Sequence, residues 1–208
     1  MSTSTFQERP SIKWGVAARP LPGQTASGDL HLVKPFSKGV LLAAVDGLGH
    51  GDEATVAAQL AVTTLERNAE EPILSLFNRC HEALRQTRGV VLTLASLHPR
   101  EATLSWLGVG NVEGRLLRAD PKTNPQSESV LLRGGVVGYQ LPALRTSVEP
   151  ISPGDLLIFA TDGIRAGFAQ GLALGDPPQQ IADGILTRHL KGNDDALVLV
   201  ARFIANHD

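Results

Sequence analysis

The sequence predicts an α+β domain whose sheets are mainly antiparallel. Short apolar runs of strand length, separated by turn residues, fill most of the 208-residue chain. The first two helical patterns follow one another directly, and two helices in succession form a hairpin instead of a crossover to a parallel strand. A chain of this length can bury a sizeable core in one domain, whereas two full domains would be cramped. We therefore expect a single domain over residues 1–208.

The first half of the chain is expected to form three strands and then two helices. Gly39–Val45 is the clearest strand, because it is short, uncharged and apolar throughout. Acidic residues suit the first turn of the first helix, and Pro72 suits the start of the second. The expected elements are strands at Ile12–Ala18, Leu30–Lys34 and Gly39–Val45 and helices at Asp52–Asn68 and Ile73–Arg88. In the first helix the apolar positions are Val56, Leu60, Val62 and Leu65.

The second half supplies most of the remaining strands and one more helix. Asp155–Ala160 is apolar after its first residue, which indicates another buried strand. Both tryptophans, Trp14 and Trp106, fall within strand patterns and are expected in the core. The expected elements are strands at Val90–Leu97, Ala102–Gly108, Gly114–Arg118, Val130–Leu132, Leu144–Val148, Asp155–Ala160 and Ala196–Ile204, and a helix at Pro178–His189.

The composition argues against several classes of protein. The chain has 19 Lys and Arg against 21 Asp and Glu, a formal net charge of −2, and lacks the basic stripe that nucleic-acid binding needs. No apolar run reaches the ~18 residues of a membrane span. The single cysteine, Cys80, cannot form an internal disulfide, so we expect a cytoplasmic protein without a nucleic-acid or membrane partner. The oligomeric state is left open, with a monomer as the working expectation.

Four aspartates occupy related places at strand ends. Asp29 and Asp194 stand just before expected strands, whereas Asp46 and Asp162 stand just after them. In an antiparallel sheet the start of one strand lies beside the end of its neighbour, so all four carboxylates can gather at one end. At ~4 Å and an effective dielectric constant of ~20, each like-charged pair costs on the order of 4 kcal/mol. Such a cluster requires protonation or bound cations.

A set of oxygen donors without paired histidines or cysteines suits Mg²⁺, Mn²⁺ or Ca²⁺ better than Zn²⁺. Two such ions, typically ~3.5–4 Å apart, can acidify a shared water and orient it for in-line attack on phosphorus. Gly47, directly after Asp46, lets the backbone approach an ion closely and offer its carbonyl oxygen. Against this, Asp-Gly is a common turn dipeptide and aspartate before a strand is ordinary loop chemistry. Any one of these acids is as readily structural, and the hypothesis depends on all four together.

The acidic motifs, taken together, resemble a known family. They are similar in order and spacing to the successive motifs of PPM-type metal-dependent protein phosphatases, in particular the SpoIIE-like bacterial branch. The segments that carry the resemblance are SGD at 27–29, DGLGHG at 46–51, TDG at 161–163 and DDA at 194–196. RCHEAL at 79–84, TRG at 87–89, GVGNV at 108–112 and GVVGY at 135–139 extend it to the stressosome phosphatases of that branch.

The resemblance implies an α-β-β-α sandwich of two antiparallel sheets, each flanked by a helix pair. It also implies two Mn²⁺ or Mg²⁺ ions and hydrolysis of phosphoserine or phosphothreonine by metal-activated water. Asp46, Asp162 and Asp194 would act in catalysis through that water, and Asp195 is not expected to be a ligand. The implied metal ligands are Asp29, directly or through a water, Asp46 bridging both ions, the Gly47 carbonyl, Asp162 and Asp194.

The resemblance further implies a substrate class. Stressosome phosphatases act on phosphorylated STAS-domain proteins of the RsbS and RsbR types, and so reset stress signalling. Many relatives carry a histidine two residues after the bridging aspartate, where it can protonate the leaving oxygen. That position is Leu48 here, and His50, two residues further on, is more readily a loop histidine than a general acid. Asp120–Ser129 and Arg165–Asp176 are candidate docking segments near the predicted site.

Rival functions have weaker support. A catalytically silent relative would bind a phosphorylated partner without cleaving it, but its mark would be a lost metal aspartate, and none is lost. The GLGHG run at 47–51 lacks the spacing of a dinucleotide-binding loop, and no EF-hand pattern is present. Cys80 and His81 are adjacent on a helix and point to different faces, so Cys80 is expected to be structural.

Overall fold

The computed structural model describes residues 12–49 and 51–204. Its helices are α1 (Asp52–Arg67), α2 (Ile73–Ala83) and α3 (Pro178–His189). Its strands are β1 (Ile12–Arg19), β2 (Asp29–Phe36), β3 (Gly39–Gly47), β4 (Val90–His98), β5 (Thr103–Val109), β6 (Glu113–Leu117), β7 (Ser127–Ser129), β8 (Leu132–Arg133), β9 (Ser147–Pro150), β10 (Leu156–Ala160) and β11 (Ala196–Phe203).

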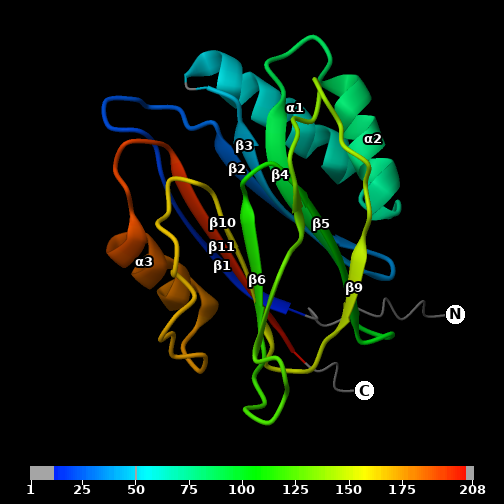
Figure 1. The fold of residues 1–208 in the computed structure, drawn as a ribbon, viewed down its shortest axis with the longest axis vertical. Coiled ribbons are helices and arrows are strands. Elements are labelled where there is room, and N and C mark those ends of the chain that lie inside the picture. Colours follow the sequence, from blue (N-terminus) through cyan, green and yellow to red (C-terminus); the bar gives the residue numbers. More distant parts are fainter. Residues whose placement is uncertain (1–11, 50, 205–208) are drawn as a thin grey trace, which may run out of the picture.

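The strands form two sheets that lie face to face (Figure 1). Sheet A has the order β1-β11-β10-β6-β7, and sheet B has the order β2-β3-β4-β5-β8 with β9 paired to β5. Within the described ranges the strand pairs are antiparallel except for the short parallel pair of β5 and β8. The α+β class and the sandwich of antiparallel sheets are therefore confirmed.

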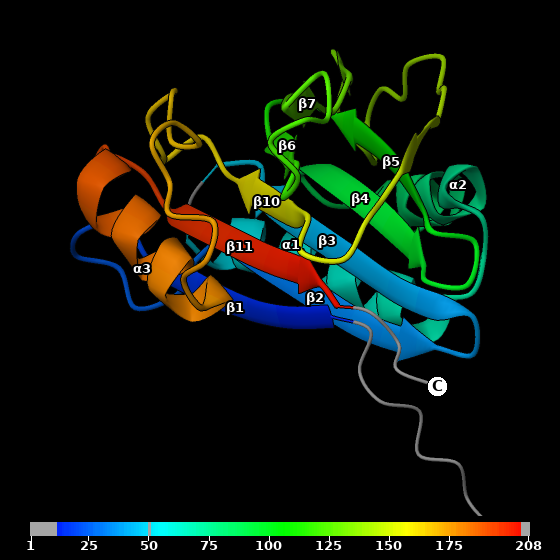
Figure 2. The same ribbon diagram turned by 90° about the horizontal axis from the view of Figure 1, so that it is seen from below.

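The helices cover the outer faces of the sheets. Helices α1 and α2 lie on sheet B, and α3 lies on sheet A, as Figure 2 shows from below. In residues 12–49 and 51–204, sheet A thus carries one helix where the resemblance implied a pair. The stretch before α3 contains Gly167 and Gly171, both with positive φ, and Pro177 precedes the helix. Because such residues favour turns over helix, this stretch stays irregular.

The core has three layers, which explains the unbroken apolar runs. Between the sheets lie large side chains such as Leu42, Trp106 and Phe159. The opposite face of sheet B packs against α1 and α2, and the opposite face of sheet A packs against α3. Since central strands such as β3 are buried on both faces, they need no polar alternation.

The buried face of α1 differs from the expected one. Val56 is 56% exposed and Leu60 is 36% exposed, although both were expected on the apolar face. Leu65 is buried as expected, and the other buried residues are alanines: Ala54, Ala57, Ala58 and Ala61. The close approach of the helix to sheet B is the reason: a Cβ on Gly47 would lie 2.1 Å from the Ala54 carbonyl oxygen. At such distances only small side chains fit between helix and sheet.

Several boundaries also differ. Helix α2 ends at Ala83, before a turn in which Thr87 N–H donates to the Leu84 carbonyl, so it is shorter than expected. Of the strand expected at Val130–Leu132, only Leu132 is in a strand, the short β8, while Val130 and Leu131 connect β7 to it. Trp106 is buried as expected, but Trp14 is 46% exposed on the edge strand β1, where its ring contacts His31. No helix in the described part of the chain is long and apolar enough to cross a membrane.

Candidate functional site

Strand register brings two of the aspartates together. In the pairing of β2 with β3, Asp29 lies directly opposite Asp46, so the first residue of one strand faces the end of its neighbour. The Gly47 N–H donates to the Gly28 carbonyl at 3.0 Å and extends this pairing by one further bond. Gly47 lies between Asp46 and the start of α1, where it has no room for a side chain. Only glycine can therefore stand at this buried position, directly after Asp46.

The other two acids reach the same place from sheet A. Strands β10 and β11 pair antiparallel with Ala160 opposite Val198, so Asp162 and Asp194 follow and precede neighbouring strand ends. Two hydrogen bonds then join the sheets. The Thr161 hydroxyl donates to Asp29 Oδ2 at 2.6 Å, and the Gly28 N–H donates to Asp195 Oδ2 at 2.7 Å. The acids of both sheets thus gather at one end of the sandwich.

The carboxylates raise one another's pKa. Burial raises the pKa of Asp46 to about 8, with further contributions from the charges of Asp29, Asp162 and Asp194. Burial also raises the pKa of Asp29 to about 7, against the opposing effect of the Thr161 hydrogen bond. The pKa of Asp162 is raised by burial and by Asp194, while Lys191 and Asn111 act in the opposite direction. The protein itself therefore does little to stabilise the ionised form of these carboxylates.

A hard divalent cation fits this set of donors. The available atoms are carboxylate oxygens and a backbone carbonyl, which suit Mg²⁺ or Mn²⁺, and a cation would relieve the repulsion. Among the residues that the structure describes, no three acidic, histidine or cysteine side chains are already closed around a common point. The carboxylates form an open cluster, so their roles as ligands stay predictions.

Asp195 uses its carboxylate differently from its neighbour Asp194. Its Oδ1 accepts the Leu21 N–H and its Oδ2 accepts the Gly28 N–H, both at 2.7 Å. Asp194 is exposed, and its Oδ1 accepts the N–H of Asp195 at 2.9 Å. The second aspartate of the pair thus holds the segment before β2 in place through two backbone N–H groups. His50, considered as a general acid, lies outside the described residues.

Two residues of this site were not singled out from the sequence. Asn111 donates its Nδ2–H to Asp162 Oδ2 at 2.9 Å, and Thr161 holds Asp29. Asn111 belongs to the GVGNV motif, so a signal was present without an assigned role.

Arg88 forms an ion pair with Glu53, and a Cβ on Gly49 would lie 2.7 Å from the Arg88 Nη1. This guanidinium therefore stands beside the loop that follows Asp46.

One expected docking segment lies at the wrong end of the molecule. Strand β6 pairs antiparallel with β10, so Glu113 lies opposite Ala160 and Leu117 opposite Leu156. The loop that follows β6, part of Asp120–Ser129, is therefore at the end remote from Asp162, at the bottom of Figure 1. The other expected docking segment, Arg165–Asp176, begins near the site. The Arg165 N–H donates to the His189 carbonyl there. Its far end contacts Arg202 through the carbonyls of Leu174 and Asp176.

Cys80 has the structural role expected for it. It lies on the buried face of α2, and its thiol is 3.9 Å from the Ala61 carbonyl oxygen of α1. Burial raises the pKa of the thiol to about 12, which disfavours the thiolate that a nucleophile needs.

Comparison with known proteins agrees with this geometry. The profile of the family described as Stage II sporulation protein E (SpoIIE) matches residues 37–204, most of the chain. The chain belongs to the SpoIIE family. Among curated proteins it is similar to the phosphoserine phosphatase RsbX of Bacillus subtilis (strain 168), with 23% identity over 183 residues, or 86% of this chain and 89% of RsbX.

Solved structures show the same fold. A chain from work on the bacterial stressosome, described as a modular system adapted to control secondary messenger signalling, superposes with a TM-score of 0.83 and 30% identity. That match covers 92% of this chain and 99% of the other. RsbX in complex with magnesium gives a TM-score of 0.83 at 22% identity, over 95% of this chain and 98% of RsbX. The expectation of a PPM-type serine/threonine phosphatase of this SpoIIE family is confirmed.

Proposed function

We propose that this chain is a metal-dependent phosphoserine/phosphothreonine protein phosphatase formed by a single domain over residues 1–208. The observation that carries the proposal is the gathering of Asp29, Asp46, Asp162 and Asp194 at one end of the sandwich in a member of a phosphatase family. Without a cation the ionised forms of these clustered carboxylates repel one another, so the site favours an external divalent ion.

Each residue of the site has a definable part in this chemistry. Asp46, Asp29, the Gly47 carbonyl, Asp162 and Asp194 would hold two Mn²⁺ or Mg²⁺ ions. Bound ions supply Lewis acidity, which lowers the pKa of water and offsets the charge of phosphate oxygens. Asn111 keeps Asp162 in one orientation through its amide, and Asp195 fixes the backbone before Asp29. The Lys191 ammonium, whose charge acts on Asp162, supplies a positive group for a phosphate dianion.

The proposed substrates are phosphorylated STAS-domain proteins of the stressosome, of the RsbS and RsbR types. Two matches support this class: the similarity to RsbX and the similarity to a chain solved in work on the stressosome. A cytoplasmic location belongs to the same proposal, because the partners are expected there.

The test is phosphate release from a phosphorylated STAS-domain protein, with Mn²⁺ and with EDTA, for the unaltered chain and for Asp162→Asn. We expect Mn²⁺-dependent release that EDTA abolishes, and a variant that folds but loses turnover and at least one bound ion. Asp183→Asn is the matched control, since Asp183 lies on α3 and accepts a hydrogen bond from Gln179 at 2.9 Å. That control is expected to retain full activity.

The outcomes separate the parts of the proposal. Full activity in Asp162→Asn would remove the metal-based mechanism. Cleavage of an aryl phosphate without cleavage of the STAS partner would retain the chemistry and remove the substrate class. Absence of turnover on both substrates, in a folded and metal-loaded protein, would favour the catalytically silent relative.

A further inference from the structure

Thr161 stands where the two sheets meet at the acidic end. It is 2% exposed and follows β10 directly, one residue before Asp162. Its backbone N–H donates to the Leu197 carbonyl at 3.1 Å and so continues the pairing of β10 with β11 in sheet A. Its side chain reaches Asp29, which belongs to sheet B. One residue therefore connects a backbone ladder of one sheet with a carboxylate of the other.

The bonding of the hydroxyl determines its direction. The Leu197 N–H donates to Thr161 Oγ1 at 2.8 Å, which occupies one lone pair of that oxygen. The single hydroxyl proton then has a close acceptor in Asp29 Oδ2 at 2.6 Å, while the Leu197 carbonyl is 3.4 Å away. Since a hydroxyl has one proton to donate, the short contact receives it. Asp29 Oδ2 is thus held as an acceptor by a donor that is itself fixed by backbone.

The position of Asp29 gives this contact its importance. Asp29 lies opposite Asp46 in the β2–β3 ladder, and the charges of Asp162 and Asp194 both act on it. A rotation of its carboxylate would change the arrangement of donors between the two sheets. Thr161 and Asp29 are both buried, so their contact is shielded from bulk solvent.

We propose that Thr161 is a positioning residue of the metal site, which orients the Asp29 carboxylate toward an ion shared with Asp46. The inference rests on the proposed metal-dependent function. The Leu197 N–H fixes the Thr161 hydroxyl, and the hydroxyl holds the Asp29 carboxylate of sheet B beside the acids of sheet A. Outer contacts of this kind typically change metal affinity by 10–100-fold when they are removed.

The experiment measures Mn²⁺ affinity by isothermal titration calorimetry for the full chain and three variants. Thr161→Val preserves side-chain shape and removes the hydroxyl, and we expect Mn²⁺ binding to weaken about 10–100-fold. Thr161→Ser restores the hydroxyl and is expected to bind within about threefold of the unaltered chain. Thr93→Val is the matched control, because Thr93 is also fully buried but donates to the Val112 carbonyl at 2.6 Å instead of to a carboxylate. Its Mn²⁺ affinity is expected to remain within about twofold.

Two further readouts distinguish positioning from a general loss of structure. The Tm in EDTA should fall by similar amounts in Thr161→Val and Thr93→Val. The increase in Tm on adding Mn²⁺ should become smaller only in Thr161→Val. The Mn²⁺ concentration for half-maximal phosphate release should rise in parallel with the calorimetric Kd, and serine should reverse both changes. If Thr161→Val does not fold, Thr161→Ala provides the same measurement without a second methyl group at this position.

Equal Mn²⁺ affinity in the unaltered chain and a folded Thr161→Val would overturn this inference while leaving the proposed function intact. Equal losses in the valine and serine variants would overturn it as well, because the hydroxyl would then not be the cause. An unaltered chain that binds no Mn²⁺ or Mg²⁺ and releases no phosphate would overturn both proposals.

Discussion

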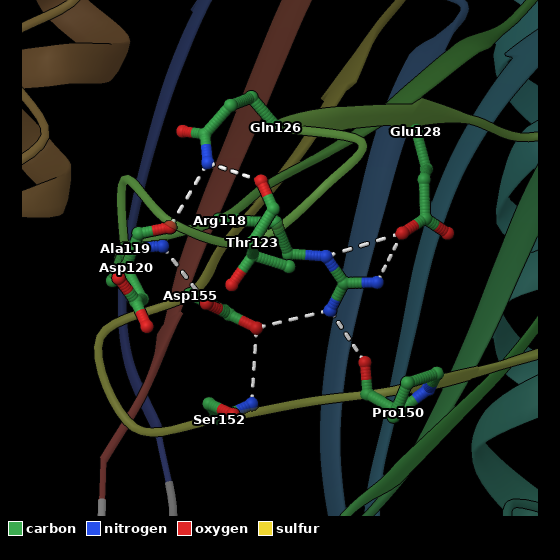
Figure 3. Close-up of polar contacts among 9 residues, drawn as sticks. All are labelled: Arg118, Ala119, Asp120, Thr123, Gln126, Glu128, Pro150, Ser152 and Asp155. Atoms are coloured by element: carbon green, nitrogen blue, oxygen red, sulfur yellow. Dashed lines mark hydrogen bonds and ion pairs between the residues drawn. The ribbon is translucent and has the colours of Figure 1, made fainter.

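The two ends of the sandwich bury carboxylates in opposite ways. At the acidic end, Asp29 is 4% exposed and its carboxylate accepts a hydrogen bond from a neutral hydroxyl, that of Thr161. At the far end, Asp155 is 3% exposed and is paired with the buried guanidinium of Arg118 at 3.1 Å. Asp155 also accepts the N–H groups of Ala119 and Ser152 at 2.9 and 3.0 Å. Figure 3 shows that Arg118 additionally bonds Glu128 and the Pro150 carbonyl.

The difference separates a structural charge cluster from a binding site. A buried ion pair with all its hydrogen bonds made holds chain segments together and needs nothing from outside. The Arg118 cluster joins the end of β6 to β7 and to the β9–β10 connection. In the part of the chain that the structure describes, no guanidinium is bonded to Asp29 or Asp46 as Arg118 is to Asp155. Burial and the neighbouring aspartates raise the pKa of both carboxyl groups. Such an end is completed by a cation that the protein does not itself provide.

Exchanging an aspartate for asparagine at each end should give the largest contrast. Asp46→Asn is expected to reduce Mn²⁺-dependent phosphate release by about 10³-fold or more, because a ligand and a centre of charge are lost. Its metal-free form should be more stable than the unaltered chain at pH 8, since a repelled buried carboxylate has been removed. Asp155→Asn should have the opposite effects: the variant should be less stable than the unaltered chain and should retain Mn²⁺-dependent phosphate release. Phosphate release and urea unfolding in EDTA check both, and a destabilised but active Asp46→Asn would contradict the comparison.

Removing the cation at the far end should have a large effect on stability alone. Arg118→Met leaves Asp155 and Glu128 without their shared partner, which typically costs about 3–5 kcal/mol. For a chain of this size we expect Tm to fall by roughly 10 °C. Thermal unfolding gives the loss, and Mn²⁺ affinity measured below Tm should be unchanged. Weakened Mn²⁺ binding in the folded variant would show that the two ends are coupled.

The smallest effect is the response of stability to pH. The pKa values of Asp29 and Asp46 are raised from the ordinary 3.8 to about 7 and about 8. From the ordinary pKa up to the raised pKa of each group, the folded chain therefore binds more protons than the unfolded chain. Stability of the metal-free protein should therefore fall as pH rises from 6 to 8.5, by a few kcal/mol at most. At the far end Glu149 acts in the same direction with a pKa of about 6, raised by burial and by Glu128.

Urea midpoints at pH 6 and pH 8.5, in EDTA and in saturating Mn²⁺, measure this response. The loss of stability with pH should be clear in EDTA and largely absent with Mn²⁺, because bound ions favour the ionised carboxylates. A metal-free protein that is more stable at pH 8.5 than at pH 6 would be opposite to the expected sign.

Large parts of this protein follow from its sequence. Uncharged apolar runs identify strands such as β3 and β10, because a strand buried on both faces has no place for a polar side chain. The places of Asp29 and Asp46 beside strand ends predict their meeting, because antiparallel pairing puts a start next to an end. The order of the acidic motifs also predicts the family, which the profile match confirms.

Other features were decided only by the tertiary structure. The alanine face of α1 is buried because the helix lies very close to sheet B, a distance that local hydrophobic spacing does not encode. The remote place of the β6–β7 loop follows from the pairing of β6 with β10. Arg118 and Asp155 lie 37 positions apart in sequence, and Thr161 and Asp29 lie 132 apart. Such contacts depend on how two sheets pack, so neighbouring residues in the sequence carry no signal of them.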